Sequence, residues 1–206
     1  FETEFFRKLN YSVDYVGNPS VDSVAYYKEH QAIPKDTFIK EEGLANKPIL
    51  ALLSGSRKQE IKDNLPTMLK VASAYPDYQP VIAGAPGIDP AYYQEYIGSY
   101  PAKIVFGKTY PLLQHSAAAL VTSGTATLET ALFRVPQVVC YYVVAGQLAS
   151  FIFKHFFHTK YISLVNLIGG REIVQELFGA RFSESQIQDE LGRILQDPAY
   201  RKRMLD

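Results

Sequence analysis

The chain has 206 residues, 47% of them hydrophobic, so it can bury one large core or two small ones. Its 21 basic and 21 acidic residues give no formal net charge and form no basic stripe, which argues against broad contact with a nucleic-acid backbone, so we expect no nucleic-acid partner. Its one cysteine, Cys140, lies in an apolar run that predicts a buried strand, so no disulfide forms within the chain and a reducing compartment fits.

The first part of the chain predicts loosely connected elements. We expect a helix over 1–9, a strand over 12–16, a helix over 21–29 and a helical piece near 35–43. The chain starts within structured sequence and stops within the helical pattern of 198–206, so we expect a piece of a longer protein.

From residue 49 onward, strand and helix patterns alternate regularly. Continuous apolar runs such as 49–53 indicate strands buried on both faces, which is typical of parallel sheets. We therefore predict an α/β fold in which a Rossmann-like parallel sheet carries helices on both faces. The expected strands cover 49–54, 80–83, 103–106, 117–122 and 136–142, and the expected helices 63–75, 90–99, 110–115, 125–133 and 146–157. Pro66 fits the first of these helices only near its start, and a capping box at Ser183 and Gln186 predicts one more helix.

The run 123–129 joins a predicted strand to a predicted helix through small residues. The backbone N–H groups and the helix dipole would face outward together at this turn, which is the arrangement of an anion site. A carboxylate one helical turn deeper is placed to accept hydrogen bonds from ribose hydroxyls. The sequence thus predicts a nucleotide site made by Ser123, Gly124, Thr125, Ala126 and Glu129. The alternative is an ordinary turn in which Thr125 caps the helix.

A second glycine turn, Gly55-Ser56-Arg57, follows the first strand of the alternation. It lies at the same edge of the predicted sheet, where its guanidinium adds to the anion site. The spacing matches neither a dinucleotide fingerprint nor a P-loop, which disfavours NAD and P-loop chemistry. The alternative for Arg57 is a solvated ion pair with Glu60.

A third candidate is the segment 163–172. Its glycines predict a turn that opens a helix, with Arg171 and Glu172 in the first helical turn. The Asn166 amide could then orient a sugar or a phosphate. The alternative is that Asn166 bonds only its own local backbone, which is common for asparagine in loops.

The segment 151–161 mixes aromatic and basic residues. It fits a helix resting on an anionic bilayer or, more often for such a composition, a helix packed in the core. His155 and His158 have helical spacing, but no acid or cysteine nearby completes a ligand shell, so we expect no metal site.

In chain order, Gly17-Asn18-Pro19, Gly55-Ser56-Arg57, 123–129 and 163–172 resemble the motifs of lipid-A-disaccharide synthases. The likeness covers nearly the whole chain, and the Asn166 segment is its more specific part. The resemblance implies one half of a two-domain glycosyltransferase of the GT-B type. Residues 1–47 would then be the end of the amino-terminal domain and the linker, and 48–206 the donor-binding domain.

The resemblance also implies the chemistry. The enzyme would move 2,3-diacylglucosamine from UDP to 2,3-diacylglucosamine 1-phosphate with inversion and without a cofactor, at the cytoplasmic face of the inner membrane of a Gram-negative bacterium. The catalytic base would belong to the missing amino-terminal domain. Contacts with the UDP-sugar are implied for Gly55, Ser56, Arg57, Ser123, Gly124, Thr125, Ala126, Glu129, Asn166 and Arg171.

Two alternatives stay open at this point. A UDP-N-acetylglucosamine 2-epimerase shares the phosphate turn but needs further acid and base groups in the cleft. A UDP-binding module without catalysis needs only the nucleotide contacts.

Overall fold

A computed structural model describes residues 3, 6–7, 10–122, 124–143 and 161–206. Its strands are β1 (Ile49–Leu53), β2 (Gln79–Gly84), β3 (Lys103–Phe106), β4 (Ser116–Val121), β5 (Gln137–Tyr141) and β6 (Glu176–Phe178). Its helices are α2 (Pro19–His30), α3 (Lys35–Glu41), α4 (Lys58–Ser73), α5 (Pro90–Ile97), α6 (Thr109–Gln114), α7 (Thr125–Leu132), α9 (Leu164–Gly169), α10 (Glu184–Gln196) and α11 (Pro198–Leu205), with a 3-10 turn at Gly179–Arg181.

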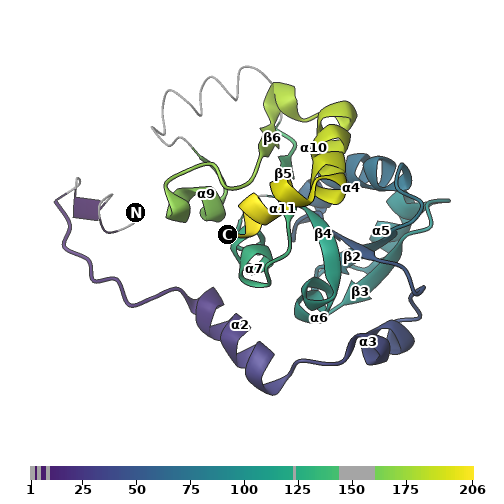
Figure 1. The fold of residues 1–206 in the computed structure, drawn as a ribbon, viewed down its shortest axis with the longest axis horizontal. Helices are drawn as coiled ribbons and strands as arrows, with labels where there is room; N and C mark the ends of the chain where they lie inside the picture. The colour runs from purple at the N-terminus through teal and green to yellow at the C-terminus, as the bar shows by residue number, and fades with distance from the viewer. Residues whose placement is uncertain (1–2, 4–5, 8–9, 123, 144–160) are drawn as a thin grey trace.

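The strands form one parallel sheet in the order β3-β2-β1-β4-β5-β6, with helices on both faces (Figure 1). This confirms the predicted fold class. The chain runs outward from β1 to β3 and then crosses back to the other side of β1. The strand order therefore reverses between β1 and β4, which is where open α/β sheets leave a crevice for ligands.

Alternate residues of β1 enter two separate apolar cores. Leu50 and Leu52 pack with α4, α5 and α10 on one face of the sheet. Ile49, Ala51 and Leu53 pack on the other face, with Phe38 of α3 and the leucines of α6. The continuous apolar run thus reflects burial on both faces, as its sequence predicts.

The helix α2 lies outside the sheet and packs against α7. The ring of Tyr27 meets that of Phe133 edge to face, with their centroids 5.8 Å apart. Lys28 donates a hydrogen bond of 2.7 Å to the Leu132 carbonyl at the end of α7, and its ammonium lies 5.2 Å from the centre of the Phe133 ring.

Two local predictions are wrong. Residues 12–16 do not form a strand, because no described strand lies beside them to complete a hydrogen-bonded ladder, and Val16 is 95% exposed. The helix expected over 63–75 begins five residues earlier, at Lys58, so Pro66 lies inside α4. Pro66 is exposed, and the carbonyl that it leaves without a helical donor belongs to the exposed residue Lys62.

Other predicted segments lie partly or wholly outside the described residues. Of the helix expected over 1–9, residues 3 and 6–7 are described and are helical. The helix expected over 146–157, and with it most of 151–161, lies outside the described residues. Within the described part of the chain, no helix is both long enough and apolar enough to cross a membrane. The domain boundary at residues 47 and 48 stays a prediction.

Burial of Cys140 makes its reactivity a probe of folding. The residue lies on β5 without solvent exposure, and burial raises the pKa of its thiol to about 12. We expect iodoacetamide to modify the native chain only as it unfolds, far more slowly than in urea, because the reacting species is an accessible thiolate. Mass spectrometry of the alkylated chain measures both rates, and equal rates would contradict a buried β5.

Candidate functional site

A pocket of about 470 Å³ opens at the carboxyl ends of β1, β2 and β4. Both glycine turns singled out in the sequence contribute to its lining, with Gly55, Ser56 and Arg57 on one side and Gly124, Thr125, Ala126 and Glu129 on the other. Ser123 lies outside the described residues. The structure thus brings seven of the ten predicted site residues together at the point where the strand order reverses.

Two hydrogen bonds join the carboxyl ends of β1 and β4, next to the two turns. The backbone N–H and the hydroxyl of Thr122 both donate to the Leu53 carbonyl, at 2.9 and 3.1 Å. Gly84, at the end of β2, also lines the pocket, and a Cβ there would lie 2.4 Å from the ring of Phe106. The lining of the pocket is therefore close-packed at these strand ends.

The turn before α7 presents backbone N–H groups to the pocket. Gly124 is the N-cap of this helix and has no side chain to cover them, and α7 has no acidic residue in its first turn. The φ of Gly124 is +121°, a conformation that favours glycine, and a Cβ there would meet nothing within 4 Å. No described side chain caps this helix start, and the binding of an anion there stays a prediction.

The turn before α4 is arranged differently, because a carboxylate of the chain already covers it. The side chain of Glu60 accepts hydrogen bonds from the N–H groups of Ser56 and Arg57, at 2.9 and 3.3 Å. Its other oxygen lies 3.1 Å from the Arg57 guanidinium. The ion pair considered from the sequence is thus present, and Glu60 itself lines the pocket.

Glu129 lies half-buried on α7, one helical turn beyond Thr125. Burial raises the pKa of its carboxyl group, although a hydrogen bond of 3.1 Å from the Tyr110 hydroxyl opposes this shift. Burial and the neighbouring carboxylate raise the pKa of Tyr110 to about 12, so this phenol stays a proton donor. Sequence reasoning missed Tyr110 because it lies on another helix, nineteen positions away, with no motif around it.

The segment 163–172 differs from its prediction. The helix α9 runs up to the first glycine, Gly169, and the second, Gly170, ends it in a left-handed conformation, so Arg171 and Glu172 are not in a helix. Ser163 caps α9, because its hydroxyl accepts a hydrogen bond from the Asn166 N–H. Serine is a favoured N-cap residue, so the sequence itself offers Ser163 as a helix start. The glycine pair marks the end of a helix here because Gly in the left-handed region is a common stop signal.

Asn166 binds the chain itself, which corrects its predicted contact with the donor. The side chain is fully buried, and its amide nitrogen donates to the Val174 carbonyl at 2.8 Å and to Glu176 at 2.9 Å. Its oxygen accepts from the N–H groups of Ile173 and Val174, at 2.7 and 3.0 Å. With two donated and two accepted bonds the amide has no capacity left for a ligand.

The buried carboxylate of Glu176, at the start of β6, completes this network. It accepts from the N–H groups of Ile162 and Ser163 and from the Ser163 hydroxyl, at 2.9, 2.9 and 2.7 Å. Together with the bond from Asn166 these contacts tie α9 to β6. The sequence does not reveal this role, because Glu176 lies outside every motif considered.

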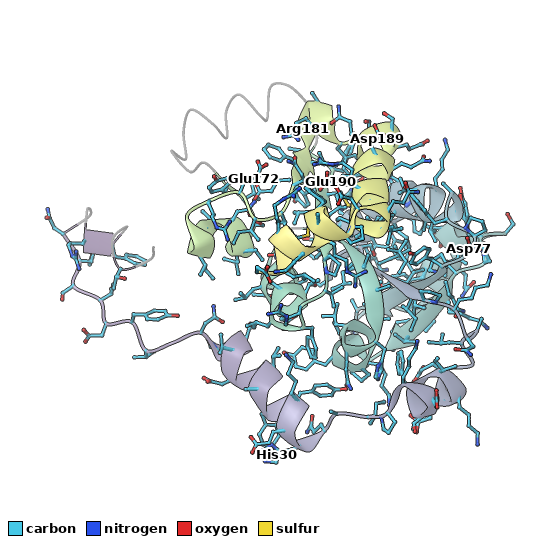
Figure 2. All side chains as sticks on the ribbon, in the orientation of Figure 1. His30, Asp77, Glu172, Arg181, Asp189 and Glu190 are labelled. Atoms are coloured by element: carbon cyan, nitrogen blue, oxygen red, sulfur yellow. The ribbon has the colours of Figure 1, made fainter. Side chains whose placement is uncertain are left out.

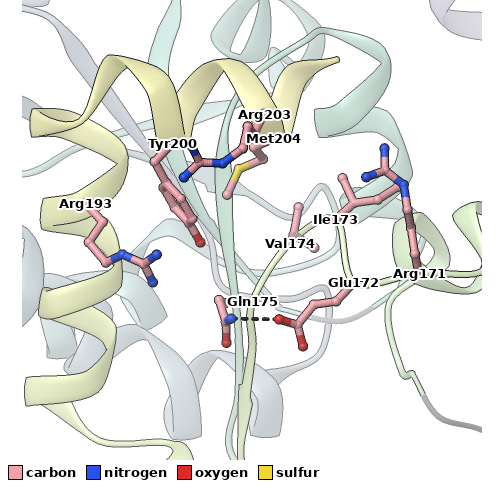
Figure 3. A pocket seen from close by; sticks show the side chains of 9 residues that line it. All are labelled: Arg171, Glu172, Ile173, Val174, Gln175, Arg193, Tyr200, Arg203 and Met204. Carbon is pink, nitrogen blue, oxygen red and sulfur yellow. Dashed lines mark hydrogen bonds between the residues drawn. The ribbon is translucent and has the colours of Figure 1, made fainter.

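Arg171 also lies away from the nucleotide pocket. It lines a separate pocket of about 230 Å³ together with Tyr200 and Arg193, and Figure 3 shows it at the opposite edge of this pocket from Arg193. The Arg193 guanidinium lies 4.0 Å from the centre of the Tyr200 ring and 3.0 Å from the carboxylate of the buried Glu190. Glu190 lies on α10, where Figure 2 labels it. The structure does not bring Arg171 together with the two glycine turns.

A further hollow of about 520 Å³ lies on the other side of the α7 start. Asn18, Pro19 and Ser20 line it together with Thr125 and Ile168. Asn18 caps α2 by accepting from the Ser20 N–H at 2.9 Å. The Gly17-Asn18-Pro19 motif therefore starts α2 beside the start of α7.

Among the described residues, no three His, Cys, Asp or Glu side chains gather into a possible metal site. His155 and His158 lie outside them.

A family model and curated relatives match nearly the whole chain. The sequence model of Lipid-A-disaccharide synthetase matches residues 1–204. The lipid-A-disaccharide synthase of Solibacter usitatus is 32% identical over 209 residues, covering 99% of this chain and 53% of that protein. That of Myxococcus xanthus is 33% identical over 217 residues, covering 100% and 54%. The chain spans about half the length of the curated relatives it matches.

Solved structures share the fold at low sequence identity. A UDP-GlcNAc 2-epimerase from Neisseria meningitidis, bound to UDP-GlcNAc, aligns with a TM-score of 0.65 at 16% identity over 95% of this chain and 50% of its own. The glycotransferase of kitacinnamycin aligns with a TM-score of 0.51 at 16% identity over 85% and 40%. These likenesses show the fold alone.

The saturated amide of Asn166 predicts a stability phenotype. Asn166→Ala leaves the Glu176 carboxylate and three backbone groups short of partners, so we expect it to lower the free energy of unfolding in urea by about 3 kcal/mol. Asn46→Ala, at an exposed asparagine, should change this free energy little. An Asn166 variant with unchanged stability and lost UDP affinity would restore the ligand role.

Proposed function

Because the chain belongs to the lipid-A-disaccharide synthetase family, we propose that it is the UDP-sugar-binding half of an inverting glycosyltransferase. The proposed reaction moves 2,3-diacylglucosamine from UDP to the 6-hydroxyl of 2,3-diacylglucosamine 1-phosphate. A single observation carries the proposal: one pocket at the strand reversal holds an open helix start, an arginine and a half-buried carboxylate.

The pocket suits a nucleoside diphosphate. The uncovered N–H groups at the start of α7 receive the diphosphate, since the helix dipole and the N–H groups both favour an anion there. Arg57 adds a positive charge from the opposite turn. Glu129 accepts from the ribose hydroxyls, one helical turn away from the phosphate.

The same groups account for the bond cleavage. As the glycosidic bond breaks, negative charge develops on the departing UDP, and fixed N–H groups with Arg57 stabilise it more than they stabilise the ground state. The base that deprotonates the acceptor hydroxyl is assigned to the amino-terminal half of the enzyme. The location at the inner membrane is likewise a proposal that follows from the lipid substrates.

The composition of the pocket favours transfer over epimerisation. Among the described lining residues the carboxylates are Glu60 and Glu129, and none is His or Lys. Glu60 is engaged by its own turn, and Glu129 is assigned to the ribose. An epimerase needs additional acid and base groups at the sugar, so product analysis of the full-length enzyme separates the two: a disaccharide supports the proposal, and a C2-epimerised sugar nucleotide refutes it.

Calorimetry with UDP tests the binding half of the proposal. Arg57→Ala should weaken UDP binding by about 1.5–3 kcal/mol, the scale of a charge-assisted hydrogen bond, and weaken uridine binding much less. Arg134→Ala is the matched control, because it removes an exposed arginine whose nearest carboxylate, that of Asp206, is 4.0 Å away. Equal losses for UDP and uridine would make Arg57 a structural residue instead.

The ribose assignment predicts a pH dependence. Burial raises the pKa of Glu129, and only its ionised form accepts two hydroxyl bonds, so the preference for UDP over 2′,3′-dideoxy-UDP should fall as pH falls through that pKa. Both ligands carry the same diphosphate, so its titration cancels in the comparison. Glu129→Gln should reduce the preference and abolish its pH dependence. A preference that is independent of pH in the unchanged chain would refute the assignment.

A further inference from the structure

The two glycine turns of the pocket look equivalent in sequence but differ in what occupies them. At the start of α4, the Glu60 carboxylate takes the place of a bound anion, with one oxygen on the N–H groups of Ser56 and Arg57. At the start of α7, the N-cap Gly124 provides no such cover. The pocket therefore has one helix start filled by its own chain and one that is open.

The glycine of the first turn makes this arrangement possible. The φ of Gly55 is +111°, and a Cβ at this position would lie 2.5 Å from the Glu60 Cβ and 2.6 Å from its carboxylate oxygen. Removing the Cβ lets the Glu60 side chain lie flat over the turn. At Gly124 an added Cβ meets nothing within 4 Å, so that turn is kept clear.

The same carboxylate holds the arginine. The Arg57 side chain is 81% exposed, whereas that of Glu60 is 21% exposed, so Glu60 is the better fixed partner of the pair. Its second oxygen lies 3.1 Å from one guanidinium nitrogen. A guanidinium has five N–H donors, and one bond to Glu60 leaves four for a phosphate.

We propose that Glu60 is a positioning residue: an internal anion that closes the α4 turn to phosphate, directs the diphosphate to the α7 turn and holds Arg57 over it. The inference rests on the proposed function. Tethering an exposed arginine before the ligand arrives reduces the side-chain freedom that is lost on binding. Glu60 acts through Arg57 and the turn, and it makes no contact of its own with the diphosphate.

A double-mutant cycle on UDP affinity tests this role. Glu60→Gln keeps an acceptor for the turn but loses the charge that holds Arg57, and we expect UDP affinity to fall by a few fold. Glu60→Ala removes both, and the expected loss is about tenfold. In an Arg57→Ala background Glu60→Gln should alter UDP affinity less than about twofold, because the group being positioned is absent, and the loss caused by Glu60→Ala should be clearly smaller than with Arg57 present.

The control separates positioning from helix capping. Asp197 caps α11 with its carboxylate, by accepting from the N–H groups of Ala199 and Tyr200, and it does not line the nucleotide pocket. Asp197→Ala should lower thermal stability and leave UDP affinity unchanged. If Glu60→Ala costs the same UDP affinity with and without Arg57, Glu60 is a cap only and the inference is wrong.

Two further outcomes would overturn the inference while the proposed function stands. Tighter UDP binding by Glu60→Gln would make Glu60 a competitor of the phosphate. Rapid hydrogen exchange of the Ser56 and Arg57 amides in the nucleotide-free chain would show that the carboxylate does not cover them; we expect slow exchange that becomes fast in Glu60→Ala. Failure of the unchanged chain to bind UDP would instead remove the proposed function and the inference together.

Discussion

The pairing of β1 with β4 is the contact on which the site depends. It joins two strands that are distant in sequence, and Thr122 reinforces it at the carboxyl end by two hydrogen bonds to the Leu53 carbonyl. Because the sheet order reverses here, the chain leaves β1 toward one face and β4 toward the other. The α4 and α7 turns therefore diverge instead of packing together, and the pocket is the space between them.

Whether a strand or turn could be predicted depends on how strongly its burial or chemistry constrains the local sequence. The central strands were predictable because burial on both faces requires continuous apolar runs, and the two glycine turns were predictable because their chemistry follows directly after those runs. The predicted strand at 12–16 is wrong because a strand-like residue pattern does not show whether a partner strand lies beside it. The β6 strand, Glu176–Phe178, was missed because three residues are too few to show a repeating pattern of apolar and polar positions.

The candidate site could be predicted from sequence only for residues that line the pocket and are available to a ligand. Gly124 and Arg57 are such residues, and the local sequence around each is enough to indicate an anion site. Asn166 stands in the more specific motif of the resemblance, yet its amide is saturated within the fold. A distinctive motif can thus serve to build a buried hydrogen-bond network and not to bind a ligand. The partners in such a network lie at positions that sequence spacing does not reveal.

The placement of α2 beside α7 has an electrostatic consequence. Asn18 and Thr125 line one hollow while Lys28 reaches the Leu132 carbonyl, so the two helices run in the same direction and their positive ends lie side by side. Parallel dipoles repel each other, and Lys28 reduces that repulsion by placing a cation at the carbonyl end of α7. At the amino ends no described acidic side chain does the same for α7, whose first turn has none. Asp22 supplies a negative charge in the first turn of α2, so the amino end of α7 is the end without an acidic residue. An anion held there neutralises it, so the binding energy of the anion and the cohesion of α2 with α7 are thermodynamically linked.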